Sequence, residues 1–291
     1  MNEGYGAQSM TAPLRRVLMR RPGPEMAAAD PAAWHYTSAI DLDEARSAHD
    51  AFADALRAWD VEVLYHDEPL PEHADSVFVF DPALVTDRGT LLLSMGKELR
   101  RGEEESLARS LQAYGVPIYG RIEGAARCEG GDTMWLDHDT LAAGRGFRTN
   151  AEGVRQLRAL LAPLGVTVLD YDLPYFTGPE ACLHLLSLIS SVDEGLAVAY
   201  RPLMPTAFWD ELKRRGVRLL EVPEEEFART QATNVLCVAP RRVIMLAGSP
   251  VTQGLLEEAG CEVVTFPGEP LSFKAEGGPT CLTRPVWRAA E

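Results

Sequence analysis

A thiol, an imidazole and several carboxylates recur at similar positions along this chain. Counted from the nearest preceding turn of a repeated pattern, the distances are 21 residues for Asp81, 14 for Glu129, 17 for Asp132, 19 for His184 and 21 for Cys281. A thiolate nucleophile, an imidazole base and cation-binding carboxylates are sufficient for covalent chemistry on a cationic substrate. Their similar positions predict that they meet in one pocket if the repeated segments surround a common axis.

Cys281 is the strongest candidate nucleophile. It follows two glycines and a proline in Glu276–Thr283, a composition that suits a tight loop close to a ligand. A lone cysteine is more often a small buried apolar residue, so the prediction depends on the shared position with His184. Cys128 and Cys182 are alternatives that lie beside other candidate residues but lack a glycine loop.

The imidazole and the carboxylates have both structural and functional interpretations. His184 stands in the apolar segment 181–190, which we expect to form a strand. If Glu129 faces it, the carboxylate would orient the imidazole and raise its pKa. Asp81 interrupts an apolar run, where a carboxylate must find a donor or a cation, and capping of a strand end is the alternative. Thr233 and Asn234 take the corresponding position in the remaining repeat.

The repeated pattern consists of a helix, a turn and a short apolar strand. Its five turns are spaced 55, 50, 51 and 44 residues apart, a period typical of repeat architectures, and they lie at Asp60, Gly115, Gly165, Gly216 and Gly260. Two further apolar runs precede each helix in most units, which predicts an α/β fold of ββαβ units. The first unit is truncated, and the C-terminal segment Pro279–Arg288 is expected to complete it by closing a ring. We expect residues 1–291 to form a single domain.

Composition narrows the classes of partner. The net charge of -15 argues against nucleic-acid binding and is compatible with a cationic small molecule. No apolar run reaches the ~18 residues of a membrane span, and the N-terminal segment has no apolar core of a signal peptide, so we expect a cytoplasmic protein. The five cysteines have no close-paired spacing, which disfavours both disulfides and a structural zinc site.

Together these motifs resemble the guanidino-group-modifying superfamily, also called pentein, of arginine deiminases, dimethylargininases and amidinotransferases. The resemblance extends from Leu14 to Arg288 and implies a five-bladed α/β propeller with pseudo-fivefold symmetry. The motifs that carry it are Asp81-Pro82, Glu129-Gly130-Gly131-Asp132, Gly144-Arg145-Gly146-Phe147-Arg148-Thr149-Asn150, His184-Leu185 and Gly277-Gly278-Pro279-Thr280-Cys281.

The resemblance implies covalent catalysis at a guanidinium carbon. Cys281 would attack the carbon while Asp81 and another acid hold the guanidinium group. His184, paired with Glu129, would protonate the leaving amine, giving a thiouronium intermediate, and would then activate the water that releases a ureido product. A cationic substrate would also favour the thiolate. No metal or cofactor is implied.

Further residues are assigned by the same resemblance. Asp132 would support the loop or the substrate, and Arg148 matches an arginine that holds the substrate carboxylate in several relatives. Three positions depart from relatives: Leu186 replaces an aspartate of deiminases and amidinotransferases, Phe80 replaces an acid of dimethylargininases, and Ser94 replaces one of their arginines. Phe80 and Leu186 predict a more apolar guanidine pocket, suited to an alkylated group.

The favoured interpretation is a cysteine-dependent hydrolase of a substituted guanidine, similar to dimethylargininase. An amidinotransferase that passes the amidino group to an amine and a non-catalytic binding protein of the same fold are the alternatives. The sequence leaves open the identity of the substrate, the oligomeric state, for which a homodimer is one alternative, and whether a loop near Pro22–His35 closes over the site.

Overall fold

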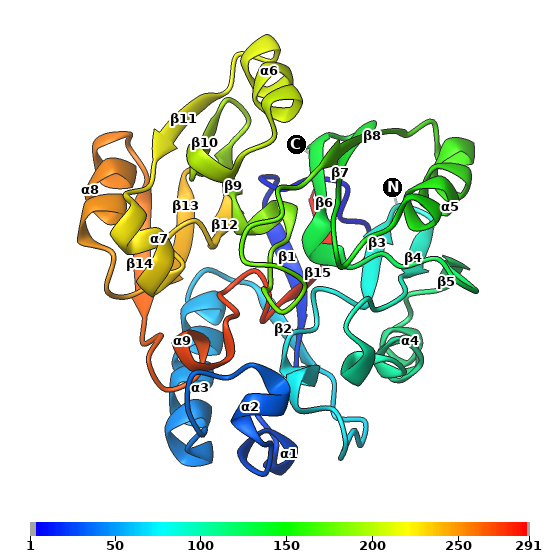
Figure 1. Ribbon diagram of the computed structural model, residues 1–291, viewed down its shortest axis with the longest axis vertical. Coiled ribbons are helices and arrows are strands. Elements are labelled where there is room, and N and C mark those ends of the chain that lie inside the picture. Colours follow the sequence, from blue (N-terminus) through cyan, green and yellow to red (C-terminus); the bar gives the residue numbers. More distant parts are fainter. Residues whose placement is uncertain (1–3, 290–291) are drawn as a thin grey trace.

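The computed structural model describes residues 4–289, which form five three-stranded sheets around a common centre (Figure 1). In each sheet the first strand pairs antiparallel with the middle strand, and the middle strand pairs parallel with the third. The strands are β15 (Arg284–Arg288), β1 (Leu14–Met19) and β2 (Glu62–Tyr65); β3 (Ala83–Thr86), β4 (Gly89–Leu92) and β5 (Ile118–Arg121); β6 (Thr133–Asp137), β7 (Thr140–Arg145) and β8 (Thr167–Asp172); β9 (Ile189–Asp193), β10 (Leu196–Ala199) and β11 (Arg218–Glu221); β12 (Val235–Ala239), β13 (Arg242–Leu246) and β14 (Glu262–Phe266).

One helix crosses from the middle strand to the third strand of each sheet. These helices are α3 (Leu42–Arg57), α4 (Glu103–Ala113), α5 (Ala151–Leu161), α6 (Thr206–Arg214) and α8 (Pro250–Glu258). A parallel pair of strands requires such a crossover, so the ββαβ unit predicted from the sequence is confirmed. The fold is the predicted α/β propeller of five such units.

Each crossover helix ends in a turn that reverses the chain into the third strand. The residue at this turn has a positive φ in all five units, from 58° at Asp60 to 84° at Gly260. Glycine adopts this left-handed backbone without a steric penalty, whereas aspartate is one of the few other residues that tolerate it. The spacing of these residues therefore reveals the repeat.

The ends of the chain close the ring. Strand β15 pairs antiparallel with β1, with Leu14 opposite Arg288 and Leu18 opposite Arg284. This pairing completes the first sheet, as the sequence predicted. Because both β1 and β15 belong to one sheet, we propose that the chain is a single domain.

The cores lie between the crossover helices and the sheets. On α5, the residues Val154, Leu157 and Leu161 are fully buried in one cluster with Leu141 of the same unit and Leu91 of the preceding one. The clusters thus join neighbouring units as well as the layers within each unit.

Two parts of the structure differ from the simple repeat. The segment before β9 is not a strand: it forms a 3₁₀ turn, Leu185–Ser187, and pairing begins only at Ile189. Four short helices lie outside the five units: α1 (Pro24–Ala27), α2 (Pro31–Trp34), α7 (Glu224–Thr230) and α9 (Ser272–Ala275). Within residues 4–289, no helix has both the length and the apolar composition to cross a membrane.

Candidate active site

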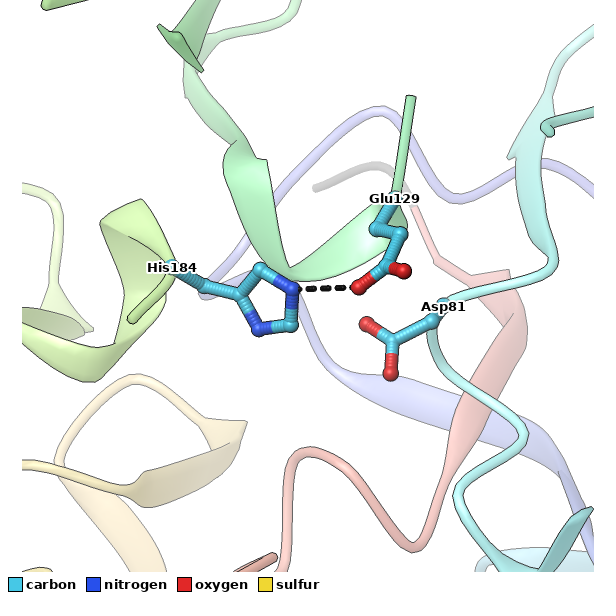
Figure 2. Close-up of side chains that lie close together, drawn as sticks. All are labelled: Asp81, Glu129 and His184. Atoms are coloured by element: carbon cyan, nitrogen blue, oxygen red, sulfur yellow. Dashed lines mark hydrogen bonds and ion pairs between the residues drawn. The ribbon is translucent and has the colours of Figure 1, made fainter. Parts of the chain in front are cut away.

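The predicted residues lie in equivalent loops near the centre of the ring. Each loop leads into the first strand of a unit, and these strands, β3, β6, β9, β12 and β15, lie nearest the centre in Figure 1. Asp81 precedes β3, Glu129 precedes β6, His184 precedes β9 and Cys281 precedes β15. Figure 2 shows Asp81, Glu129 and His184 converging from three units. One imidazole nitrogen of His184 and one carboxylate oxygen from each acid lie within 4.8 Å of one another.

His184 and Glu129 form a buried pair. The imidazole Nε2 lies 2.7 Å from Glu129 Oε2 (Figure 2). The other carboxylate oxygen accepts hydrogen bonds of 2.9 Å from the backbone N–H groups of Gly96 and Lys97, and Arg148 Nη1 lies 3.5 Å from Oε2. Burial would raise the pKa of Glu129, but the hydrogen bond and charge of His184, together with Arg148, outweigh it and lower that pKa strongly.

The imidazole of His184 is held in place by its neighbours. Its backbone N–H donates to Ser187 Oγ at 3.0 Å, and its ring packs against Gly131, where an added Cβ would lie 2.5 Å from Nδ1. Burial would lower the pKa of His184, but the neighbouring Cys182, Asp132 and Glu129 raise it well above its usual value. These neighbours therefore favour the protonated imidazolium form of His184.

Cys281 is partly exposed and its thiol interacts with Asn234. The Asn234 Nδ2 group donates to Sγ at 3.2 Å, and the same side chain accepts from the backbone N–H of Thr280 at 3.0 Å. Burial of the thiol, together with the charge of Asp81, raises the pKa of Cys281 to about 11. The free thiol is therefore protonated at neutral pH, and it needs a cation or a base nearby to become a nucleophile.

Asp81 already binds a guanidinium group of the protein itself. Arg100 Nη1 donates to its Oδ2 at 2.7 Å, and the backbone N–H of Gly131 donates to Oδ1 at 2.9 Å. Arg100 is buried and also pairs with Glu103 at 2.8 Å. Asp81 still lines the cavity at the thiol, so a substrate would share this carboxylate with Arg100.

Asp132 supports a loop. Its Oδ1 accepts from the backbone N–H of Leu185 at 3.1 Å, its Oδ2 has no hydrogen-bond partner among the described residues, and it is not among the residues that line the cavities at the thiol. Burial raises its pKa to about 6. Of the two roles that the sequence suggested for Asp132, the geometry favours the structural one.

Two cavities meet at Cys281 and His184. The wide cavity measures about 500 Å³, and Phe80 and Leu186 line it. The narrow cavity measures about 40 Å³, and Asp81 and Arg148 line it together with Asp75, Lys97 and Trp34. Every predicted site residue except Glu129 and Asp132 thus lines one of the two cavities, and Glu129 acts through His184.

Several residues at the site had no assigned role in the sequence-based prediction, or, like Cys182, only the role of an alternative nucleophile. Asn234 lies at about the same distance from the preceding turn as the catalytic candidates do. This position in the repeat was the signal that could have assigned it to the site. Cys182, with Sγ 3.9 Å from His184 Nδ1, lines both cavities, whereas the rival Cys128 is fully buried. Lys97 pairs with Asp75 at 2.6 Å, and no pattern in the sequence indicates that contact.

The loop near Pro22–His35 reaches the site at its end. His35 follows α2 and lines both cavities, and its Nε2 lies 3.1 Å from Glu180 Oε2 in the loop that precedes β9. A polar contact between two loops, His35 to Glu180, therefore lies among the residues that line both cavities.

Asp81, Glu129 and His184 have the spacing of a metal site, but their bonds suit proton transfer. Glu129 is engaged by His184 and by backbone N–H groups, and Asp81 is engaged by Arg100. The group can instead bind a planar cation beside a thiol and deliver a proton to it.

Sequence comparison identifies relatives over most of the chain. Residues 29–287 match the family model "N,N dimethylarginine dimethylhydrolase, eukaryotic". An N(G),N(G)-dimethylarginine dimethylaminohydrolase of Streptomyces coelicolor is 33% identical over 93% of this chain and 96% of its own length. A protein of the same name from Pseudomonas aeruginosa is 32% identical over 84% of this chain and 89% of its own.

Solved structures agree with this relationship. The Pseudomonas aeruginosa dimethylarginine dimethylaminohydrolase, as a cysteine-to-serine mutant complexed with citrulline, superposes with a TM-score of 0.76 at 27% identity, covering 93% of this chain and 98% of its own. An amidinotransferase from Microseira wollei has a TM-score of 0.79 at 16% identity, with coverage of 99% and 98%, and it shares the fold. The chain therefore belongs to the N,N-dimethylarginine dimethylaminohydrolase family.

Proposed function

We propose that this protein hydrolyses a methylated arginine to citrulline and a methylamine, with Cys281 as the nucleophile. The observation that carries the proposal is the 2.7 Å hydrogen bond between Glu129 and His184, whose imidazole lines a cavity that Cys281 also lines. A thiol, an acid and a cation-binding carboxylate at one point are the groups that guanidinium hydrolysis requires.

The reaction begins when the guanidinium group binds beside Asp81. Its positive charge lowers the pKa of Cys281 from about 11, so the thiol gives its proton to solvent and the thiolate forms on binding. Sγ then forms a bond with the guanidinium carbon. The bond from that carbon to the substituted nitrogen breaks, and His184 gives this nitrogen a proton, so the amine leaves and a thiouronium group remains on Sγ.

The second half of the reaction uses the imidazole as a base. Neutral His184 accepts a proton from a water molecule as the oxygen adds to the thiouronium carbon. The S–C bond breaks, Sγ leaves as thiolate, and the added hydroxyl loses its remaining proton to solvent, so the product carries a neutral ureido group. Glu129 stabilises the imidazolium at each stage, and Asn234 stabilises the thiolate through its 3.2 Å hydrogen bond.

The experiment is a comparison of dimethylarginine, monomethylarginine and arginine, with citrulline and the released amine both quantified. Turnover without an added amine acceptor supports the hydrolase, whereas a strict requirement for an acceptor supports the amidinotransferase. Cys281→Ser should abolish turnover. Cys261→Ser, which alters a buried thiol away from the cavities, is the matched control and should retain it. Unchanged activity of Cys281→Ser would refute the mechanism.

A further inference from the structure

The wide cavity continues beyond the reacting atoms into a space bounded by three phenylalanines. Phe176 comes from the loop between β8 and β9, Phe227 from α7 and Phe273 from α9. We call this space the aromatic chamber. Helices α7 and α9 lie outside the five repeated units, so the chamber is built largely by segments that the propeller itself does not need.

The chamber is apolar where it meets the thiol. Phe80 and Leu186 line it beside Cys281 and His184, and both side chains are almost fully buried. Neither can bind a guanidinium nitrogen, and the two carboxylates that line the wide cavity, those of Glu180 and Glu276, belong to exposed residues. A nitrogen that carries an alkyl or aryl group fits better there, because its substituent makes no demand for hydrogen bonds.

Three of the polar side chains that line the wide cavity are already bonded to the protein. Thr233 Oγ1 donates to the backbone oxygen of Ser187 at 2.7 Å, and Gln231 Nε2 donates to the backbone oxygen of Ser272 at 2.9 Å. Asn234 uses its amide on Cys281 and Thr280. These side chains already have hydrogen-bond partners within the protein, so they do not require a polar ligand.

The far wall is rigid. Phe227 stacks on Tyr200 with ring centroids 3.9 Å apart and an interplanar angle of 8°. Such a preformed aromatic surface favours flat or apolar groups, since little side-chain entropy is lost on binding.

The narrow cavity has the opposite character. Its walls carry the charges of Asp75, Lys97, Arg148 and Asp81, and it measures only about 40 Å³. With the guanidinium carbon at Cys281 and its unsubstituted edge at Asp81, a third nitrogen is directed away from these charges. The charged part of a substrate suits the narrow side, and an apolar substituent suits the chamber.

The wide cavity as a whole is larger than two methyl groups require. Two methyl groups occupy about the space of two waters, or ~60 Å³. The cavity of about 500 Å³ falls within the range of pockets that enclose drug-sized ligands.

We propose that the aromatic chamber binds an apolar substituent on the leaving nitrogen of the substrate, larger than methyl, such as a butyl or benzyl group. The inference rests on the proposed function, because it places the substituted nitrogen at His184. It makes Phe176, Phe227 and Phe273 specificity-determining residues, and it makes N-alkylated or N-arylalkylated guanidines the preferred substrate class.

Two measurements test this assignment. The first is calorimetric binding of guanidine, methylguanidine, butylguanidine and benzylguanidine to the Cys281→Ser protein, which cannot turn over. The second is kcat/KM for arginines with dimethyl, butyl or benzyl groups on the terminal nitrogen. Affinity and kcat/KM should rise by about fourfold for each buried methylene, the factor that corresponds to ~0.8 kcal/mol.

A matched pair of variants tests the aromatic wall. Phe176 and Tyr175 are neighbours with exposed fractions of 46% and 70%, but only Phe176 lines the chamber. Phe176→Ala should weaken benzylguanidine binding by about fivefold to tenfold relative to methylguanidine. Tyr175→Ala should leave both affinities unchanged.

The outcomes separate the chamber from the proposed function. Affinity that does not rise with substituent size, or equal effects of Phe176→Ala and Tyr175→Ala, would overturn the chamber even if dimethylarginine is hydrolysed. Size-dependent binding without hydrolysis of any arginine derivative would retain the chamber and overturn the hydrolase.

Discussion

Replacing Glu129 by glutamine tests the central pair of the site. The side chain is fully buried, so its charge is not shielded by water. A glutamine oxygen can still accept from the N–H groups of Gly96 and Lys97, but its NH₂ group then faces Nε2 of His184 and cannot accept the proton of an imidazolium.

The size of the effect follows from the buried charge. Removing one partner of a buried ion pair costs ~3–5 kcal/mol. Part of that cost is avoided if the imidazole becomes neutral, so we expect the pKa of His184 to fall in the variant. Less of the general acid is then present at neutral pH, and the loss of its contribution should lower kcat by about 100-fold.

The assay is the pH profile of kcat for dimethylarginine between pH 5 and 10, for the unmodified protein and for Glu129→Gln. The raised pKa of His184 keeps the acid form present as pH rises, so the basic limb should move to lower pH in the variant. Thermal unfolding should show that the variant is folded. A lower kcat with an unmoved basic limb would refute the role of Glu129 in tuning the imidazole.

Three further predictions concern other parts of the structure. Asn234→Ala removes the hydrogen bond to Cys281, and a hydrogen bond to a charged thiolate contributes ~1.5–3 kcal/mol. The pKa of the Cys281 thiol should therefore rise by about 1–2 units, as measured by the pH dependence of iodoacetamide alkylation. An unchanged alkylation profile would contradict this prediction. Gly131→Ala places a Cβ 2.5 Å from Nδ1 of His184, which displaces the imidazole ring. This displacement should lower kcat by about 100-fold while the circular dichroism spectrum stays that of the folded protein. A near-normal kcat would contradict the tight packing of the ring against Gly131. Burial lowers the pKa of His49 from 6.5 to about 4, a difference of 2.5 units, so between these pH values the unfolded chain binds a proton that the folded protein does not bind. The free energy of unfolding should therefore fall by up to ~3 kcal/mol from pH 6.5 to pH 4. Urea unfolding at both pH values measures this, and His49→Leu should reduce the loss.

The position of the site could be predicted from the sequence because the repeat is marked by backbone geometry. A positive φ at Gly115 or Gly260 leaves a visible residue preference, and counting forward from each turn reaches the central loops. The same reasoning failed for the segment around His184, where apolar residues suggested a strand. Leu185 and Leu186 are apolar because they are buried in a 3₁₀ turn beside the cavity, and burial alone does not distinguish these conformations.

Contacts between distant segments left no comparable signal. The pairing of Arg100 with Asp81 depends on the path of the chain after β4, which places a buried guanidinium beside a carboxylate that a substrate would also use. The aromatic chamber depends on α7 and α9, which have no counterpart in the other units. Side chains that meet by tertiary packing lack the periodicity by which repeats are recognised.

The pairing of β15 with β1 has a consequence for folding. Cys281 lies three residues before β15, and β15 pairs with a strand that is far from it in the sequence. Contacts between segments so distant in sequence form slowly, because a long loop must be closed first. We therefore expect the thiol proposed as the nucleophile to reach His184 late in folding, after β15 has paired with β1.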